Sequence, residues 1–380
     1  MMSTQSGGDI LFKKFFSTGG TDAKLLAAVL IAAIFGIIMI NSASHSLANP
    51  ARYVIVQSAA LIIGVAAALV LTFLDYSLLY TLRHAAMAAG IAMLILVLVI
   101  GFGREDTGTR GWIDLGIVNV QPSEIAKVCF IVSLSAHISK IHEDINSLRN
   151  VLFLMLHLAV PVVLILLQPD AGTAMVFIFI FVVMMFFAGI SYKYIFSALA
   201  VGAVGAAGAW FFYLTPIQKA RFFAFLDPES DPLNTGYHTI QSKIAVGSGR
   251  LFGTGYMHGT QTQMGYIPEK QTDFIFSVIC EELGFIGAIA TILLLFFILY
   301  RIFSNARKAK DSFGEMLCAG TGAMLLFHTV ENIGMCINVL PITGIPLPFF
   351  SYGGSNMITS MISIGMVLSV AMHRRLNAFS

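Results

Sequence analysis

Long apolar stretches separated by short polar ones set the pattern of this sequence. The apolar stretches fall at about 23–42, 52–74, 82–102, 121–139, 151–168, 171–190, 194–214, 273–300, 313–340 and 353–373. They are close to the roughly 20 residues that a helix needs to cross a bilayer, and none shows the short alternating segments of an outer-membrane barrel. The pattern predicts an all-α integral membrane protein with ten transmembrane helices, which puts both termini on the same side.

Composition agrees with a membrane protein. Of 380 residues, 57% are hydrophobic and only 11% are charged, which is too little charge to coat a soluble globule of this size. We therefore expect a single polytopic membrane domain over residues 1–380. The net charge of +2 indicates no class of partner, and we expect no nucleic-acid partner. The four cysteines all lie in apolar stretches, where buried packing residues are expected rather than disulfides or zinc ligands.

Basic residues predict the orientation in the membrane. The short loops of one side carry only Arg52, Arg104 and Arg110. The segments of the other side carry Lys13, Lys14, Lys24, Arg83, Lys140, Arg149, Lys193, Arg301, Arg307, Lys308, Lys310, Arg374 and Arg375. Because cytoplasmic loops are enriched in Lys and Arg, both termini are expected in the cytoplasm, with residues 1–22 as a cytoplasmic tail that leads into a retained anchor.

The connection over residues 215–272 is then extracytoplasmic, and it is too long for a simple linker. It contains a helix-like run, HTIQSKIAV, in which Ile240, Ile244 and Ala245 share one face. That pattern predicts an interfacial or re-entrant helix that covers the membrane surface as a lid. The glycine-rich GSGRLFGTG at 247–255 follows no strand and lacks a dinucleotide or Walker spacing, so we expect tight turns there rather than a phosphate site.

Three carboxylates mark the stretch PEKQTDFIFSVICEELG at 268–284. Asp273 lies at the mouth of an apolar helix, and Glu281 and Glu282 lie inside it. An ionised carboxylate in hydrocarbon costs several kcal/mol unless it is paired or faces water, so each of the three is a candidate functional group. Asp273 has a structural alternative, because Thr272 could be the N-cap and an aspartate in the first turn gains about 0.3–1 kcal/mol from the helix dipole. The residues alone leave both interpretations open.

Further polar residues lie near the predicted outer ends of other helices. Glu124 and Lys127 share one face just inside an apolar helix, either as a structural salt bridge or as the lining of a polar cavity. Gln168-Pro169-Asp170 ends one helix and begins the next, where capping is a sufficient explanation. Glu331 and Asn338 are seven residues apart and are predicted to share a helical face. Together these positions predict a water-accessible cavity that opens to the exterior.

Several long motifs occur in order along nearly the whole chain. They are RGWIDLG…QPSEIAK, QPDAGT, DPESDPLNTGYHTIQSKIAVGSG, PEKQTDFIF…EELG and GIPLPFFSYGGS. In these motifs the sequence resembles the SEDS family, which serves bacterial shape, elongation, division and sporulation. The GIPLPFF form of the last motif is more similar to the elongation members than to the division members.

The resemblance implies a function. Family members are peptidoglycan glycosyltransferases that polymerise lipid II, the undecaprenyl-diphosphate-linked disaccharide peptide, on the outer face of the bacterial cytoplasmic (inner) membrane. By this resemblance the chain would act in cell elongation and rod-shape maintenance, beside a class B penicillin-binding protein and other membrane proteins of the elongation machinery. The resemblance also implies that Asp273, in TDFIF, is catalytic and that Trp112, in RGW, is functionally important.

The implied reaction has two chemical needs. A base must take the proton of the attacking sugar hydroxyl, and positive charge must stabilise the departing diphosphate. Asp273 is the expected general base, since partial desolvation at the membrane boundary makes a carboxylate more basic. The other expected substrate-binding residues are Glu124, Lys127, Trp112, Arg110, Lys243 and Arg221, and Arg250 is a further extracytoplasmic cation. A divalent cation held by the outer carboxylates is an alternative to these cations, but no spacing indicates a specific metal cage and no cofactor is assigned.

Two other classes of function fit parts of the pattern. A flippase or transporter of the lipid-linked cell-wall precursor would also need many helices with buried charges and a proline-broken segment. A non-catalytic scaffold for membrane partners is the third hypothesis. A transporter should place ionisable groups along a path to both faces, whereas those of this sequence concentrate at one face, which favours the enzyme.

Overall fold

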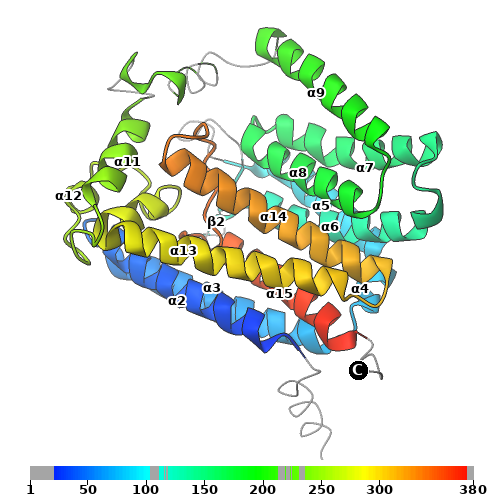
Figure 1. Ribbon diagram of the computed structural model, residues 1–380, viewed down its shortest axis with the longest axis horizontal. Coiled ribbons are helices and arrows are strands. Elements are labelled where there is room, and N and C mark those ends of the chain that lie inside the picture. The colour runs from blue at the N-terminus through cyan, green and yellow to red at the C-terminus, as the bar shows by residue number, and fades with distance from the viewer. Residues whose placement is uncertain are drawn as a thin grey trace, which may run out of the picture.

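Each apolar stretch of the sequence lies on a helix in the computed structural model (Figure 1). The structure describes residues 21–102, 111–114, 116, 119–212, 219, 223, 225–230 and 236–374. The long helices are α2 (Ala23–Ser44), α3 (Pro50–Phe73), α5 (Arg83–Ile100), α6 (Pro122–Lys140), α7 (Leu148–Leu166), α8 (Ala171–Phe187), α9 (Tyr192–Phe212), α13 (Ile275–Arg307), α14 (Ser312–Cys336) and α15 (Gly354–His373). Seven of them are long and apolar enough to cross a membrane, namely α2, α3, α5, α7, α13, α14 and α15. The all-α membrane class is confirmed, and the count of ten crossings stays a prediction.

Short elements connect the long helices. They are α4 (Ser77–Thr81), η1 (His142–Asp144), η2 (Pro228–Ser230), α11 (Tyr237–Ser248) and α12 (Thr260–Gln263). A small hairpin precedes α6, in which β1 (Ile113–Asp114) pairs antiparallel with β2 (Asn119–Val120). These two-residue strands are the only β-ladder in the described part of the chain.

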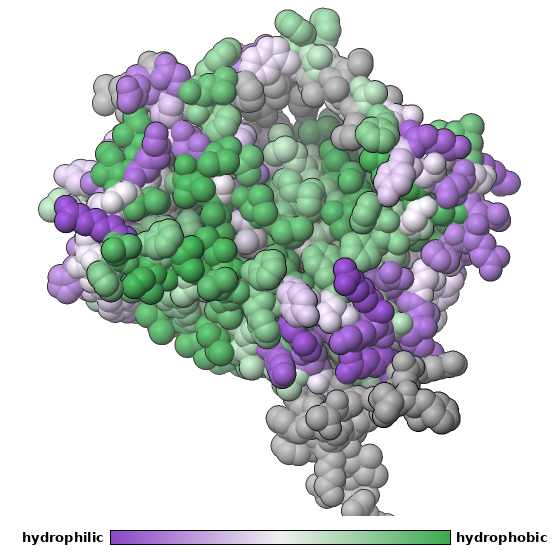
Figure 2. Space-filling view, viewed as in Figure 1, coloured by the Kyte–Doolittle hydropathy of each residue, from purple (hydrophilic) through white to green (hydrophobic). Residues whose placement is uncertain are grey.

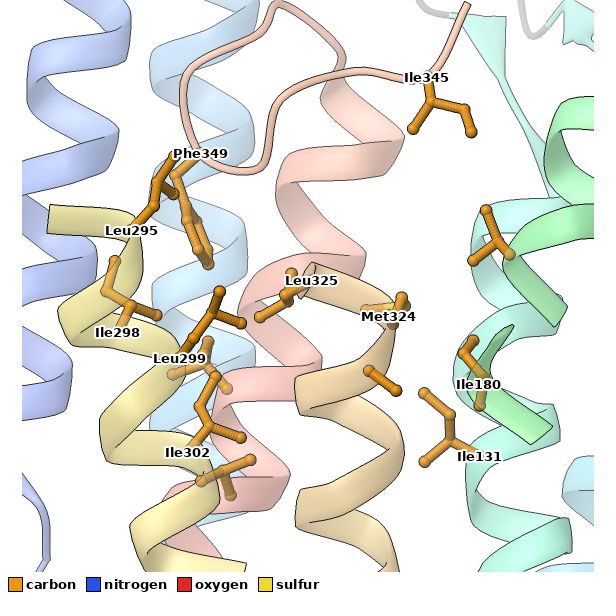
Figure 3. Close-up of a cluster of buried hydrophobic side chains, with 14 of the residues drawn as sticks. Ile131, Ile180, Leu295, Ile298, Leu299, Ile302, Met324, Leu325, Ile345 and Phe349 are labelled. Carbon is orange, nitrogen blue, oxygen red and sulfur yellow. The ribbon is translucent and has the colours of Figure 1, made fainter. Parts of the chain in front are cut away.

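Helix α14 occupies the centre of the bundle. It lies between α13 on one side and α6 and α8 on the other, and Figure 3 shows their apolar side chains pointing into the spaces between them. Leu299 of α13, Met324 of α14 and Ile180 of α8 belong to this buried core. Helix α15 packs along α3 so closely that a Cβ at Gly365 would lie 2.7 Å from the Ala68 Cα. Small residues allow such close backbone approach in membrane bundles.

The helix ends gather at two ends of the bundle. In Figure 1, α2 ends, α13 begins and α14 ends beside α11 and α12 at the left, whereas the C-terminal end of α15 lies at the opposite end. Figure 2 shows apolar side chains across the middle of the same view and hydrophilic ones towards both ends. That distribution is the one expected for helices that span a bilayer.

Helix α13 has a kink at Gly284, where φ is 66° and ψ is −162°. The kink interrupts helical pairing, and the released backbone groups pair with the glycine-rich segment 250–255 instead. The hydrogen bonds are Phe285 N to Arg250 O (2.8 Å), Ile286 N to Leu251 O (3.2 Å), Thr254 N to Glu281 O (3.0 Å) and Gly255 N to Glu282 O (3.0 Å). Gly253 and Gly255 have φ of +79° and +102°, so the predicted tight turns are confirmed. Unpaired backbone groups at membrane depth cost several kcal/mol each, and this segment satisfies them.

The helix predicted from HTIQSKIAV is present as α11, but a different face of it is buried. Thr239, Ser242 and Ala245 are buried, whereas Ile244 is 45% exposed. Ser242 Oγ lies 2.6 Å from Ser277 Oγ and donates to the Cys336 carbonyl at 2.7 Å. The small side chains let α11 come close to α13 and α14, and this leaves the larger Ile244 on the outer side.

Candidate active site

Asp273 lies in the turn just before α13. The helix begins at Ile275, its N-cap is Phe274, and no side chain caps it. Asp273 is therefore outside the first helical turn, and the interpretation that it serves α13 as a first-turn acid behind a Thr272 cap is wrong. Its own amide donates to the Glu269 carbonyl at 3.1 Å, which closes a tight turn. The side chain is half-buried at the helix entrance.

This turn is tied to the proline-rich segment 341–353. Asn332 Nδ2 donates to the Asp273 carbonyl at 2.7 Å and to the Ile345 carbonyl at 2.8 Å. Ser351 Oγ donates to the Thr272 carbonyl at 2.6 Å. The backbone of Gly344, where φ is +75°, lies so near that a Cβ there would be 3.3 Å from Asp273 Oδ2. The backbone of the turn that carries Asp273 is thus held by contacts from α14 and from the segment that follows it.

The predicted Glu124–Lys127 pair is an ion pair in the interior. Lys127 Nζ lies 2.9 Å from Glu124 Oε1, and the two residues are only 2% and 4% exposed. His328 Nε2 of α14 lies 2.9 Å from the same ammonium. Asn356 and Thr359 of α15 face the other Glu124 oxygen at 3.5 Å and 3.4 Å. Three helices therefore meet at one buried polar cluster.

Helix α14 connects this cluster with Asp273. His328 contacts Lys127, and Asn332, one turn further out, holds the Asp273 carbonyl. Glu331 is buried between them in the chain, and its Oε1 accepts from Thr343 Oγ1 at 2.9 Å. The predicted helical face shared with Asn338 is wrong, because α14 ends at Cys336 and Asn338 has a φ of +57° beyond it.

Asp170 acts as a cap, as its motif predicts. Its carboxylate accepts from Thr173 N at 2.9 Å and from Thr173 Oγ1 at 2.7 Å at the start of α8. Burial raises the pKa of this carboxyl, although the Thr173 hydrogen bonds and the charge of Lys127 act in the opposite direction. The influence of Lys127 places Asp170 near the same polar cluster.

Glu281 and Glu282 are fully buried and hold the chain that leads to Asp273. Glu281 accepts from Gln261 N at 2.7 Å, from Thr262 N at 2.9 Å and from Thr262 Oγ1 at 2.6 Å, at the start of α12. Glu282 accepts from Ser42 Oγ at 2.6 Å and from Gln263 Nε2 at 3.0 Å.

Lys270 lies beside these two glutamates and donates to the Thr262 carbonyl. Burial lowers the pKa of Lys270, whereas the charges of Glu281 and Glu282 raise it. The three ionisable groups fix the loop that carries Asp273, so Glu281 and Glu282 are structural supports in this arrangement.

The other predicted substrate-binding residues lie apart from the buried cluster or outside the described residues. Trp112 is half-buried, and its carbonyl accepts from Phe102 N at 3.0 Å beside the β1–β2 hairpin. Lys243 is exposed on α11. Arg110 and Arg221 lie outside the described residues.

Sequence reasoning missed three polar residues of this region. Asn332 and His328 are four apart on α14, so a buried polar stripe in an otherwise apolar helix was a signal that could have found them. His238 of α11 stacks on Phe274, next to Asp273, with ring centroids 6.1 Å apart. The sequence gives no sign of that contact, because α11 and α13 come together only through tertiary packing.

The part of the chain that the structure describes contains no group of three or more His, Cys, Asp or Glu side chains arranged for a metal ion. Each of the four cysteines is a free thiol, and all but Cys129 are buried. A divalent cation thus has no preformed set of side-chain ligands among the described residues.

Comparison with known proteins gives consistent matches over most of the chain. The sequence profile FTSW_RODA_SPOVE, described as a cell cycle protein, matches residues 22–376. Peptidoglycan glycosyltransferase MrdB of Escherichia coli (strain K12) is 40% identical over 288 residues, which cover 75% of this chain and 77% of MrdB. Stage V sporulation protein E of Bacillus subtilis (strain 168) is 36% identical over 315 residues, which cover 82% of this chain and 85% of that protein.

Solved structures agree with these matches. A chain from a peptidoglycan synthase complex, studied for its coordination of polymerization and crosslinking, superposes with a TM-score of 0.78 and 32% identity, covering 92% of this chain and 97% of that chain. The rod shape determining protein RodA of Thermus thermophilus superposes with a TM-score of 0.70 and 27% identity, covering 94% of this chain and 98% of RodA.

Proposed function

Since this chain belongs to the FTSW_RODA_SPOVE family of cell cycle proteins, we propose that it is a peptidoglycan glycosyltransferase that polymerises lipid II during cell elongation. The observation that carries the proposal is the 40% identity with a relative named peptidoglycan glycosyltransferase MrdB. The ordered site around Asp273 supports it independently. A half-buried carboxylate at a helix entrance, on a turn whose backbone is held from two sides, is suited to proton transfer.

Asp273 is the general base in this proposal. It takes the proton from the sugar hydroxyl that attacks the anomeric carbon of the second lipid-linked disaccharide. The bond between that carbon and the diphosphate oxygen breaks, and the lipid diphosphate leaves with the electron pair.

Lys127 and Glu124 form the buried part of the substrate site in this proposal. The ammonium of Lys127 stabilises negative charge on the departing diphosphate, and low local polarity makes that interaction stronger than in water. Trp112, Arg110, Lys243 and Arg221 are proposed to contact the substrate nearer the outer surface. A divalent cation bound together with the diphosphate is an alternative source of positive charge.

The chain is a multi-pass membrane protein, and we place it in the bacterial cytoplasmic (inner) membrane with both termini in the cytoplasm. The asymmetry of basic residues supports this orientation. It puts residues 215–272, the Asp273 turn and the outer ends of α2 and α14 on the extracytoplasmic side of one membrane domain, with residues 1–22 in the cytoplasm. A single cysteine at Ser230 should react with an impermeant thiol reagent from outside, and labelling only from the cytoplasm would contradict the orientation.

We also propose a class B penicillin-binding protein as partner, together with other membrane proteins of the elongation machinery. The structural neighbour from a peptidoglycan synthase complex supports this proposal, because polymerisation and crosslinking are coordinated there. Co-purification from membranes should recover such a protein. Full polymerase activity of the isolated chain, with no such protein recovered, would count against an obligate complex.

Polymerisation of purified lipid II by the purified chain, alone and with the partner, tests the enzymatic function. Glycan strands separated by gel electrophoresis are the expected product. If the chain makes no strands but moves labelled lipid II across a vesicle bilayer, the flippase hypothesis replaces the enzyme.

A further inference from the structure

The ammonium of Lys127 has two protein acceptors of different charge. Glu124 Oε1 and His328 Nε2 both lie 2.9 Å from Nζ. A lysine ammonium has three N–H donors and no acceptor. Among the residues that the structure describes, no third acceptor lies within hydrogen-bonding distance of Nζ. One N–H therefore has no acceptor from the described residues and is available to a ligand in the proposal below.

The contact with Lys127 fixes the state of His328. Because an ammonium can only donate, His328 Nε2 must accept, so the ring is neutral and carries its proton on Nδ1. His328 is 2% exposed, and the ring lies against the Pro346 backbone on its other side. The buried Nδ1 has no hydrogen-bond partner among the described residues, so the contact with Lys127 is the hydrogen bond that orients this ring.

We propose that His328 is a positioning residue that aims the free N–H of Lys127 at the diphosphate of the lipid-linked donor. The inference rests on the proposed function and adds a specificity element to it. Lys127 and Glu124 together carry no net charge. The neutral ring of His328 is the second acceptor and adds no charge to this pair. A second carboxylate in place of His328 would hold the ammonium equally well but would add a negative charge beside Glu124 and Asp170 and repel a diphosphate.

The fold gives His328 a second connection. Asn332, one turn further along the same helix, donates to the Asp273 carbonyl at 2.7 Å. Helix α14 therefore sets the positions of both the proposed base and the proposed diphosphate-binding cation. A rigid helix between the two groups keeps the proton acceptor and the leaving-group site in a fixed relation, which is the form of preorganisation that catalysis requires.

Three variants of His328 separate positioning from packing. His328→Gln places an amide oxygen near the Nε2 position and keeps a neutral acceptor. His328→Leu fills similar space with no acceptor. His328→Glu keeps an acceptor and adds a negative charge. A packing role would favour leucine, whereas a positioning role predicts rescue by glutamine alone.

The probe is undecaprenyl diphosphate, bound to the purified full-length chain in detergent and measured without turnover. We expect glutamine to bind within about threefold of the wild type, leucine roughly ten- to a hundredfold more weakly, and glutamate more weakly still. In lipid II polymerisation, the leucine variant should raise KM more than it lowers kcat. In a Lys127→Met background, His328→Leu should have no further effect on binding.

Equal binding by the glutamine and leucine variants, or normal binding by the glutamate variant, would overturn the inference, as would a wild type that does not bind the diphosphate. If the leucine variant does not fold, as judged by thermal unfolding, the glutamine and glutamate variants decide, since they have side chains of the same length. Wild-type binding with the expected order but no polymerisation would refute the proposed function and leave this inference standing. Polymerisation by the wild type, with binding by the His328 variants in a different order, would support the proposed function and refute this inference.

Discussion

Two ion pairs, one near each end of the bundle, have very different surroundings. At the cytoplasmic end of the proposed orientation, Arg301 makes two contacts with Asp22, at 2.8 Å and 2.9 Å. Asp22 also accepts from Asn305 at 2.8 Å and caps α2 through Leu25 N at 3.1 Å. That carboxylate has a donor for each of its sites. At the other end, Lys127 is more deeply buried and yet keeps one N–H without a protein acceptor among the described residues.

The contrast teaches how to separate supporting charges from functional ones in this protein. A buried charge is costly, and a purely structural one is expected to use all of its hydrogen-bonding capacity within the protein. Asp22 fits that description with four hydrogen bonds, and Glu281 nearly does with three. Lys127 and Lys270 each have two acceptors among the described residues. Lys270 lies in the supporting loop beside Glu281 and Glu282. Lys127 lies instead in the polar cluster of the proposed substrate site, so we expect its remaining capacity to be used by a substrate.

The largest expected effect is that of Asp273→Asn. The change preserves size and removes the basic carboxylate, so polymerisation per folded protein should fall by roughly 10²–10⁴ while folding is retained. Asp22→Asn is the matched control, because it makes the same chemical change at the saturated pair and should leave polymerisation near normal. Near-normal glycan synthesis by the Asp273 variant would end its assignment as the base.

The second largest effect is expected when both members of the Glu124–Lys127 ion pair are replaced together. Replacing a buried ion pair by apolar or neutral groups is often neutral for stability, so Glu124→Gln combined with Lys127→Met should fold. Loss of a charge that stabilises the leaving group should still lower kcat by roughly 10²–10³. The corresponding double variant of the Asp22–Arg301 ion pair, Asp22→Asn with Arg301→Met, should keep its activity. Equal losses of activity in both double variants would break the comparison.

The third effect tests whether a charged residue is structural because protein groups occupy its hydrogen-bonding sites or because it lies far from Asp273. Glu281 lies at the same end of the bundle as Asp273 but accepts three hydrogen bonds from the start of α12. Glu281→Gln should lower the free energy of unfolding by about 1–3 kcal/mol, measured by denaturation in detergent, and leave activity per folded molecule near normal. A stable but inactive variant would show that proximity to Asp273 matters more than saturation.

The smallest expected effect is that of Lys243→Met. Lys243 is exposed on α11, where water and salt weaken any contact with a phosphate. We expect KM for lipid II to rise by only roughly two- to fivefold, with the difference disappearing at high salt. A loss as large as that of the Lys127 variant would show that burial is not required for a functional cation.

The sequence predicted the helices and several helix ends because their causes are local. Apolar length defines the spans, and Asp170 caps α8, as expected. The sequence also predicted that Asp273 lies at a helix entrance. It did not show that the helix begins only at Ile275, so that Thr272 is not its N-cap.

Contacts between distant segments could not be predicted. The sequence does not reveal that Glu281 would meet α12, that His328 would meet Lys127, or that α14 would end before Asn338. The end of α14 is a local feature, with Asn338 in the left-handed region and the amide of the next residue donating to the Gly334 carbonyl. The first two depend instead on how helices far apart in the chain pack together. Periodicity within one segment carries no information on that packing.

The kink at Gly284 has a consequence for which mutations this protein tolerates. Four backbone hydrogen bonds join α13 to residues 250–255, and they involve no side chains. Within this segment, Leu251 and Phe252 are exposed, so their identities can change at small cost. Inserting or deleting a single residue would instead shift all four pairings at once and leave polar groups unpaired at membrane depth. In a deep mutational scan, this segment should tolerate substitution at the exposed positions and reject every change in length.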